Sequence, residues 1–160
     1  MTTIVGIDPG LDGGIAILND EQEPDVHIMP TMPSGKGNGR TINLQSLFGL
    51  LLDVRKPCRV IVEKQQPFPK QGGVSNFTTG YGFGAILGAL TAMEMPHIVI
   101  TPQTWMKALG IPRGSGKGGN VLAATRLFPT VNLKRTAKCK NLHDGMADAL
   151  LIAEYGRRLT

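Results

Sequence analysis

The segment IVGIDPG, residues 4–10, decides how the rest of the chain is organised. Its first four residues are apolar or small, a pattern typical of a strand that is covered on both faces. Polarity begins at Asp8, and the strand ends there because Pro9 cannot donate to a central ladder and Gly10 suits a turn. The segment therefore predicts a carboxylate at the carboxyl end of a buried strand, where open α/β sheets carry their sites. Taken alone, Asp8 could equally cap the turn.

The residues that follow predict a three-stranded antiparallel meander. Gly13 and Gly14 should turn the chain into a second strand over 15–18, and a third strand is expected at 26–29. Residues 30–40 are rich in Pro, Ser and Gly, so we expect a loop there.

A helix and a second buried strand come next. Asn43 should cap a helix over 44–52, whose leucines and Phe48 have the spacing of one apolar stripe. Residues 59–63 then repeat the first pattern, because an apolar β-branched run ends abruptly at Glu63. Strand, helix and strand in this order predict a right-handed parallel crossover.

A long glycine-containing helix is expected over about 75–95, after an irregular loop over 64–75. Gly80, Gly84 and Gly88 are four residues apart and share one helix face. Each interior glycine costs about 1 kcal/mol relative to alanine, so such a face indicates close backbone packing. The partner is either the sheet of the same chain or the same helix of a second subunit, and we prefer the second alternative.

The remaining third of the chain predicts shorter elements. A strand is expected at 97–100, followed by a helix that begins near residue 101. Residues 110–119 form a glycine-rich basic segment that we expect to be a loop, although its spacing is not that of a phosphate-binding P-loop. A short helix over 120–128 and a final helix over 141–158 complete the pattern.

The composition of the chain limits the classes of function that it can have. At 160 residues and 41% hydrophobic, the chain is expected to form a single domain over residues 1–160. Its formal charge of +5 favours an anionic partner. No apolar run reaches membrane-spanning length and no leader is recognisable, so we expect a soluble, intracellular protein without a membrane partner. Cys58 and Cys139 lack metal-ligand spacing and are expected to be reduced thiols.

Four acidic residues have no obvious partner of opposite charge. Asp148 lies among apolar residues of the last predicted helix, with no Lys or Arg one turn away. Asp144 is four residues earlier on the same face, and His143 is its neighbour. Asp8 and Glu63 end two buried strands.

The energy of such a cluster indicates a metal site. Two like charges about 4 Å apart repel by roughly 4 kcal/mol at an effective dielectric constant near 20. Divalent cations remove this repulsion, and ligand oxygens favour Mg²⁺ or Mn²⁺ over zinc. Two such ions about 4 Å apart can hold the attacking and leaving oxygens of a phosphodiester. The net-basic remainder of the chain would then hold a polyanion around an acidic centre.

The motifs together resemble a RuvC-type Holliday junction resolvase of the ribonuclease H-like superfamily. They are IDPG at 7–10, VE at 62–63, the glycine-rich helix, and ADALLIA at 147–153, and in this order they cover almost the whole chain. The HDGMAD segment at 143–148 is similar to the phage versions.

The resemblance implies an α/β fold in which helices flank a mixed five-stranded sheet, made of an antiparallel meander plus parallel strands. It also implies a homodimer that acts on branched DNA in recombination and repair, within a bacterial cytoplasm or a phage-infected cell. Paired incisions at a four-way junction would require two Mg²⁺ ions per site, which Mn²⁺ could replace. The products would carry 5′-phosphate and 3′-hydroxyl ends.

The resemblance also assigns metal ligands. Asp8, Glu63 and Asp148 match the positions that bind metal in the family. The family has an acid or a histidine three residues before the last of these, where this chain has Gly145. Either Asp144 or His143 could fill the fourth position, and we prefer Asp144.

Basic residues after the metal ligands are candidates for DNA contact. Lys107 and Lys117 lie where the family has lysines near the scissile phosphate, so Lys117 is also a catalytic candidate. Lys107 could equally be an ordinary surface lysine. Arg113 belongs to the same glycine-rich segment and is a further DNA-binding candidate.

Aromatic residues after Glu63 are candidates for stacking on unpaired bases at a junction. Phe68 and Tyr81 are the residues that we expect to be exposed for this role. Phe83 and Phe77 are expected to pack in the core instead.

Other functions remain open at this point. A ribonuclease H-like enzyme that cuts RNA, hybrids or other branched DNA would use the same metal chemistry. A junction-binding protein without catalysis is a third possibility, although none of Asp8, Glu63 and Asp148 is replaced. An actin-like ATPase or sugar kinase is excluded by length, because that fold needs two such domains.

Overall fold

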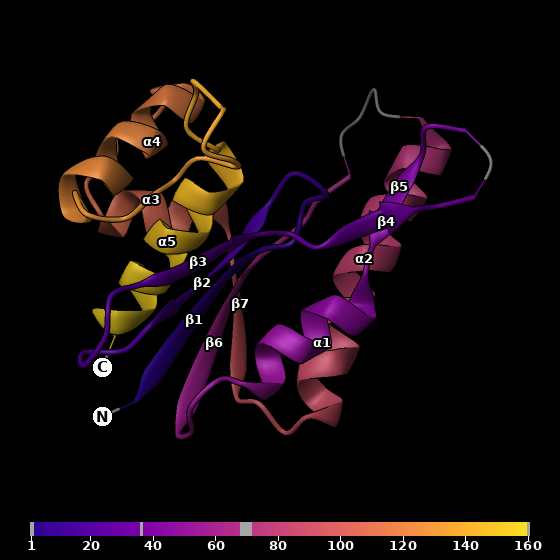
Figure 1. Ribbon diagram of the computed structural model, residues 1–160, viewed down its shortest axis with the longest axis horizontal. Helices are drawn as coiled ribbons and strands as arrows, with labels where there is room; N and C mark the ends of the chain where they lie inside the picture. The colour runs from indigo at the N-terminus through magenta and orange to yellow at the C-terminus, as the bar shows by residue number, and fades with distance from the viewer. Residues whose placement is uncertain (1, 36, 68–71, 160) are drawn as a thin grey trace.

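The computed structural model describes residues 2–35, 37–67 and 72–159, apart from the side chain of Lys117. A mixed sheet lies between two layers of helices (Figure 1). Its strands are β1 (Thr3–Asp8), β2 (Gly14–Leu18), β3 (Asp25–Ile28), β6 (Cys58–Glu63) and β7 (His97–Ile100). The helices are α1 (Leu44–Leu52), α2 (Gly73–Ala92), α3 (Pro102–Ala108), α4 (Gly116–Leu127) and α5 (Asp144–Arg157). A separate small hairpin consists of β4 (Thr31–Pro33) and β5 (Arg40–Ile42).

The topology of the main sheet confirms the predicted architecture. The five strands have the order β3-β2-β1-β6-β7. β1, β2 and β3 form the antiparallel meander, whereas β6 lies parallel to β1 and β7 lies parallel to β6. Ile7 pairs with Val62, so the next residue on each strand is a carboxylate at the same edge of the sheet. Asn43 caps α1 as predicted, because its side chain accepts a hydrogen bond from the Ser46 N–H.

The expectation of a plain loop over 30–40 is wrong. β4 and β5 pair there as an antiparallel hairpin, with Thr31 opposite Ile42. Gly35 and Gly37 have φ values of +129° and +100°, which residues with a side chain rarely adopt. The glycines that indicated irregular structure instead lie in the connection between two short strands.

The expectation of a loop over 110–119 is wrong at its end, because α4 already begins at Gly116. Glycine has a low helix propensity, so the sequence pattern placed the start of this helix too late. Ala124 of α4 is fully buried in the core beside α5, and this packing outweighs the low propensity of the first turn. Lys117 therefore lies in the first turn of a helix.

Two cores cover the two faces of the sheet. Alternate residues of β1 point to opposite sides: Ile4 packs with α3, α4 and α5, whereas Val5 packs with α1 and α2. Two glycines of the strands, Gly6 and Gly14, allow α5 to approach the sheet closely. A Cβ at Gly6 would overlap the backbone of Ala149, and a Cβ at Gly14 would overlap the backbone of Gly145.

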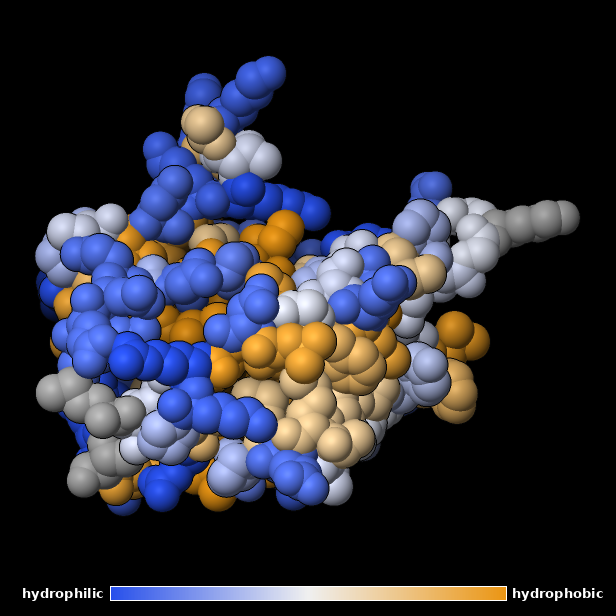
Figure 2. Space-filling view, turned by 60° about the horizontal axis from the view of Figure 1, so that its bottom comes forward, coloured by the Kyte–Doolittle hydropathy of each residue, from blue (hydrophilic) through white to orange (hydrophobic). Residues whose placement is uncertain are grey.

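The glycine face of α2 does not contact the sheet. No atom of the described residues lies within 4 Å of a Cβ built at Gly80, Gly84 or Gly88, so the alternative of packing within the chain is wrong. Near the beginning of the same helix, Val74 and Phe77 are 84% and 73% exposed. Figure 2 shows apolar side chains gathered over the half of the molecule that contains α1 and α2.

Two further features concern the length of the helices and the state of the cysteines. None of the helices in the described ranges is long and apolar enough to cross a bilayer. Cys58 and Cys139 are both free thiols, as predicted.

Candidate active site

Asp8 and Glu63 lie at the carboxyl ends of two neighbouring parallel strands. Strand side chains alternate between faces, so Asp8 points to the same side of the sheet as Ile4, and Glu63 to the same side as Ile61. Ile4 and Ile61 both pack in the core that contains α5. The two carboxylates therefore share the face on which α5 lies. Asp8 also accepts a hydrogen bond from the Gly10 N–H at 3.1 Å, so it caps the turn as well.

The pKa of Glu63 indicates that a third carboxylate, that of Asp148, lies near Asp8 and Glu63. The pKa of Glu63 is raised from 4.5 to about 7, and the largest cause is burial, which disfavours the charged form. The negative charge of Asp8 is the second cause of this increase, and that of Asp148 is a smaller one. The Trp105 indole N–H donates to Glu63 Oε1 at 2.9 Å and lowers the pKa, but it does not outweigh the other causes. Asp8 and Asp148 thus both lie close enough to Glu63 to influence its pKa.

Asp148 reaches the site because α5 packs directly on the sheet. Gly145, one turn earlier on α5, lies against the backbone of the turn that joins β1 to β2. The Asn120 side chain of α4 donates a hydrogen bond from Nδ2 to Asp148 Oδ1 at 2.8 Å. Asn120 is 8% exposed and Asp148 is half-buried, so this contact is a partly buried one.

The donor set has the chemistry of a site for a hard divalent cation. Carboxylate oxygens suit Mg²⁺ and Mn²⁺, and a cation would relieve the repulsion that raises the pKa of Glu63. As the side chains stand, the described part of the chain contains no group of three or more His, Cys, Asp or Glu residues arranged to hold a metal ion. Binding would therefore draw the carboxylates together on the ion, from backbone positions that already share one edge of the sheet.

The two candidates for the fourth ligand have different structural roles. His143 is the N-cap of α5, where its Nδ1 accepts a hydrogen bond from the Met146 N–H at 3.3 Å. Asp144 is the first residue of α5 and lies one turn before Asp148. The cap occupies a ring nitrogen of His143, which favours Asp144 for the fourth position.

The basic candidates for DNA contact lie on or near α3. Lys107 and Arg113 are both exposed, and they line one surface pocket together with Gln103, Met106 and Ile111. The backbone of Lys117 belongs to the first turn of α4, but its side chain lies outside the described structure.

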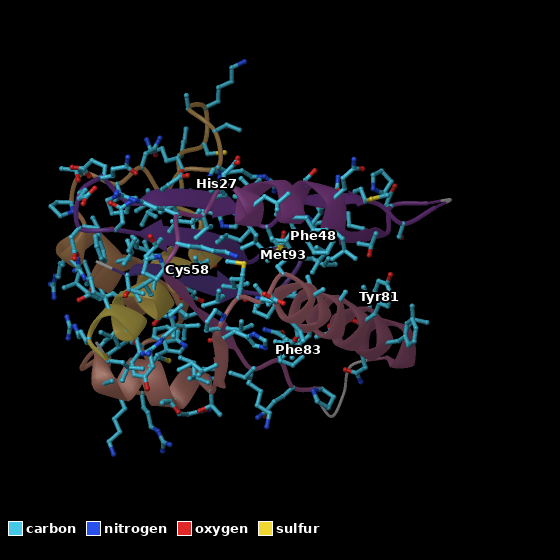
Figure 3. The ribbon with its side chains drawn as sticks, turned by 90° about the horizontal axis from the view of Figure 1, so that it is seen from below. His27, Phe48, Cys58, Tyr81, Phe83 and Met93 are labelled. Atoms are coloured by element: carbon cyan, nitrogen blue, oxygen red, sulfur yellow. The ribbon has the colours of Figure 1, made fainter. Side chains whose placement is uncertain are left out.

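The aromatic candidates lie on α2, apart from Phe68, which falls outside the described residues. Tyr81 is 55% exposed and lies toward the end of α2 that points away from the sheet (Figure 3). Its ring stacks on Phe77, with centroids 6.3 Å apart and an interplanar angle of 19°. The expectation that Phe77 packs in the core is wrong, because this part of α2 extends beyond the sheet. Phe83 packs partly buried against the core of α1 and α2, as expected.

Sequence reasoning missed two residues of the site, Trp105 and Asn120. Both hydrogen-bond a carboxylate from a helix that is distant in sequence, across 42 and 28 residues respectively. A single tryptophan shortly after a predicted strand was an available signal for Trp105. Asn120 carried no such signal.

Comparison with known proteins supports the fold. No protein-family model matches the chain, and no curated protein matches its sequence. RuvC from T. thermophilus in complex with a Holliday junction substrate aligns with 99% of this chain and 96% of its own, with a TM-score of 0.65 and 21% identity. The chain has the RuvC-like ribonuclease H fold. Another Thermus thermophilus RuvC structure aligns over 99% of this chain and 98% of its own, with a TM-score of 0.58 and 21% identity.

Proposed function

We propose that this RuvC-like chain is an endodeoxyribonuclease that resolves four-way DNA junctions by paired, metal-dependent hydrolysis of phosphodiesters. The products would carry 5′-phosphate and 3′-hydroxyl ends. The enzyme would act in recombination and repair, in the cytoplasm of a bacterial or phage-infected cell. The observation that carries the proposal is the electrostatic influence of Asp8 and Asp148 on Glu63, at the edge where β1 and β6 end.

The charge distribution supports a polyanionic substrate. The chain has a net charge of +5, although its candidate site gathers acidic side chains. Cations bound at the site would reverse its local charge, and the basic surface would hold DNA around it. Lys107, Arg113 and Lys117 are the basic residues that we assign to phosphate contact. Tyr81 and Phe68 are the aromatic residues that we assign to base stacking.

The chain's own residues would perform the following roles. Asp8, Glu63 and Asp148 would hold the metal, with Asp144 or His143 in the fourth position. When bound, Mg²⁺ would supply a water nucleophile at neutral pH and neutralise charge on the scissile phosphate and the leaving oxygen. The strands fix the backbone positions of Asp8 and Glu63, and Lys117 would hold the phosphate for in-line attack.

Paired incisions require two active sites, so we propose that the protein acts as a homodimer. The face formed by Gly80, Gly84 and Gly88 of α2 is the proposed contact. It has no close neighbour among the described residues, and its small residues would allow two helices to approach closely.

A synthetic mobile four-way junction tests the activity. We expect symmetric nicks from the unmodified protein with Mg²⁺, and none after addition of a chelator. Asp8→Asn should bind the junction without cutting it. Asp20→Asn is a matched control, because Asp20 is an exposed carboxylate just beyond β2, away from the site, and this variant should cut normally.

The same assay separates the alternatives. Cutting by Asp8→Asn at the normal rate would remove the nuclease assignment. Equal cutting of an RNA–DNA hybrid or of linear duplex would replace the junction substrate by a broader one. Specific junction binding without cutting in Mg²⁺ or Mn²⁺ would indicate a binding protein instead.

A further inference from the structure

The indole of Trp105 is the feature of the site that the carboxylate chemistry does not explain. Trp105 is the only tryptophan of the chain, and it is 1% exposed. An indole N–H can only donate, and a buried one requires an acceptor. Here the acceptor is Glu63 Oε1, at 2.9 Å, rather than a backbone carbonyl.

The indole is held firmly in place relative to the strand that carries Glu63. Trp105 lies one turn into α3, and α3 begins directly after β7, which pairs with β6. The N–H of Lys64, the residue after Glu63, donates to the Ile100 carbonyl at the end of β7, at 2.7 Å. The backbones on either side of the Trp105–Glu63 contact are therefore tied together, and the indole can hold one carboxylate oxygen in a defined direction.

A second carboxylate of the site is held in the same chemical manner. Asn120 of α4 donates from Nδ2 to Asp148 Oδ1 at 2.8 Å. Both donors are neutral, so they orient the carboxylates without cancelling their charge. A lysine or arginine in either position would compete with a cation for the carboxylate, whereas an indole or an amide leaves the negative charge available.

We propose that Trp105 is a positioning residue that orients Glu63 for a divalent cation, and that its indole reports when the cation binds. The inference rests on the proposed function, since it requires that Glu63 be a metal ligand. It goes further by assigning a role to a residue that is not itself a ligand. Indole emission responds to charge and hydrogen bonding at its N–H, and no second tryptophan obscures the signal.

The test measures cation binding directly instead of activity. Mn²⁺ binding to the whole protein is followed by calorimetry for the unmodified chain and for Trp105→Phe, which keeps an aromatic ring but has no donor. We expect the affinity to fall roughly tenfold or more in this variant, as for other partners of metal ligands. Phe128→Leu is the matched control, because Phe128 lies in the same core and makes no hydrogen bond to a carboxylate. Its affinity should change by no more than about twofold.

A second measurement uses the unmodified protein and so does not depend on the stability of a variant. Mg²⁺ is titrated into the protein, and the fluorescence of Trp105 is recorded with excitation at a wavelength that tyrosine does not absorb. We expect a saturable change in Trp105 emission at the Mg²⁺ concentrations that saturate Mg²⁺ binding in the calorimeter, and no such change in Asp8→Asn.

The possible failures are distinguishable. Unchanged emission while Mg²⁺ saturates the protein would overturn the role of Trp105 and leave the nuclease standing. Equal losses of Mn²⁺ affinity in Trp105→Phe and Phe128→Leu, or no loss in either, would have the same meaning. Absence of any cation binding by the unmodified protein would remove both the positioning role and the proposed function.

Discussion

At the scale of single residues, Glu63 makes the stability of the protein depend on pH. Its pKa is about 7 in the folded protein, against 4.5 for an ordinary glutamate. The folded protein therefore binds this proton more tightly than the unfolded chain does. Between pH 4.5 and about 7, ionisation of Glu63 costs more in the folded state, so its contribution to stability falls as the pH rises.

Removing this charge should stabilise the metal-free protein. In chelator, Glu63→Gln is expected to raise the free energy of unfolding by on the order of 1–3 kcal/mol above pH 7, because the amide cannot ionise. The gain should disappear below pH 4.5, where the Glu63 carboxyl group is protonated in both the folded and the unfolded state. The amide oxygen can still accept from Trp105. Denaturant unfolding at several pH values measures the effect, and a gain independent of pH would contradict the burial of a charged Glu63.

Substitution of His143 and substitution of Asp144 should affect stability and Mn²⁺ binding differently, which distinguishes the two candidates for the fourth ligand. His143→Ala should lower the free energy of unfolding by about 1 kcal/mol, because α5 loses its N-cap, and should leave Mn²⁺ affinity nearly unchanged. His143→Asn is its control, since asparagine is a good N-cap and should restore stability. Asp144→Asn should weaken Mn²⁺ binding instead. Loss of Mn²⁺ affinity only in the His143 variants would make His143 the ligand.

The sequence indicated those site residues whose position follows from a local pattern. Asp8 and Glu63 were predicted because each ends an apolar run, and such runs reach the same edge of a sheet when the strands are parallel. Asp148 was predicted because it interrupts an apolar helix. Trp105 and Asn120 could not be identified in this way, because their hydrogen bonds to Glu63 and Asp148 join segments that only the folded chain brings together.

At the scale of elements, the contact between α5 and β1 depends on the absence of a side chain at Gly6. A Cβ at this position would overlap the backbone of α5, which cannot move aside as a flexible side chain could. Gly6→Ala should therefore lower the free energy of unfolding by about 3 kcal/mol or more. It should also lower junction cleavage, because α5 carries Asp148.

A second glycine provides the control for this prediction. Gly49 lies in the interior of α1 with no atom of the described residues within 4 Å of a Cβ. Gly49→Ala should stabilise the protein by about 1 kcal/mol, since alanine is the better helix former. Thermal unfolding of both variants measures the contrast, and similar effects in the two would contradict the close approach of α5.

The elements that the sequence predicted well are those in which apolar residues follow a regular pattern. The buried strands and the apolar stripe of α1 were recognisable because burial imposes their patterns. The hairpin of β4 and β5 and the first turn of α4 were not, because both are rich in glycine. Glycine weakens any local preference, so packing and pairing with distant residues decide the structure of such segments.

At the scale of the whole molecule, the open glycine face of α2 predicts how two chains associate. Gly84→Leu should leave the fold intact, because no neighbouring element of the described residues lies within 4 Å of a Cβ at Gly84. It should convert the proposed dimer into monomers and abolish paired nicking, since two helices could no longer approach closely. Analytical ultracentrifugation measures the association. Gly49→Leu on α1 should remain dimeric, and dimers of Gly84→Leu would place the contact elsewhere.

The pairing of β1 with β6 has a consequence for how far such a sequence can change over evolutionary time. The spacing between Asp8 and Glu63 is set by main-chain hydrogen bonds of neighbouring parallel strands, not by particular core side chains. Apolar residues elsewhere can be exchanged for others of similar volume without moving the two carboxylates apart. A sequence can thus change widely while this fold persists, and the chain shares the fold of T. thermophilus RuvC at 21% identity.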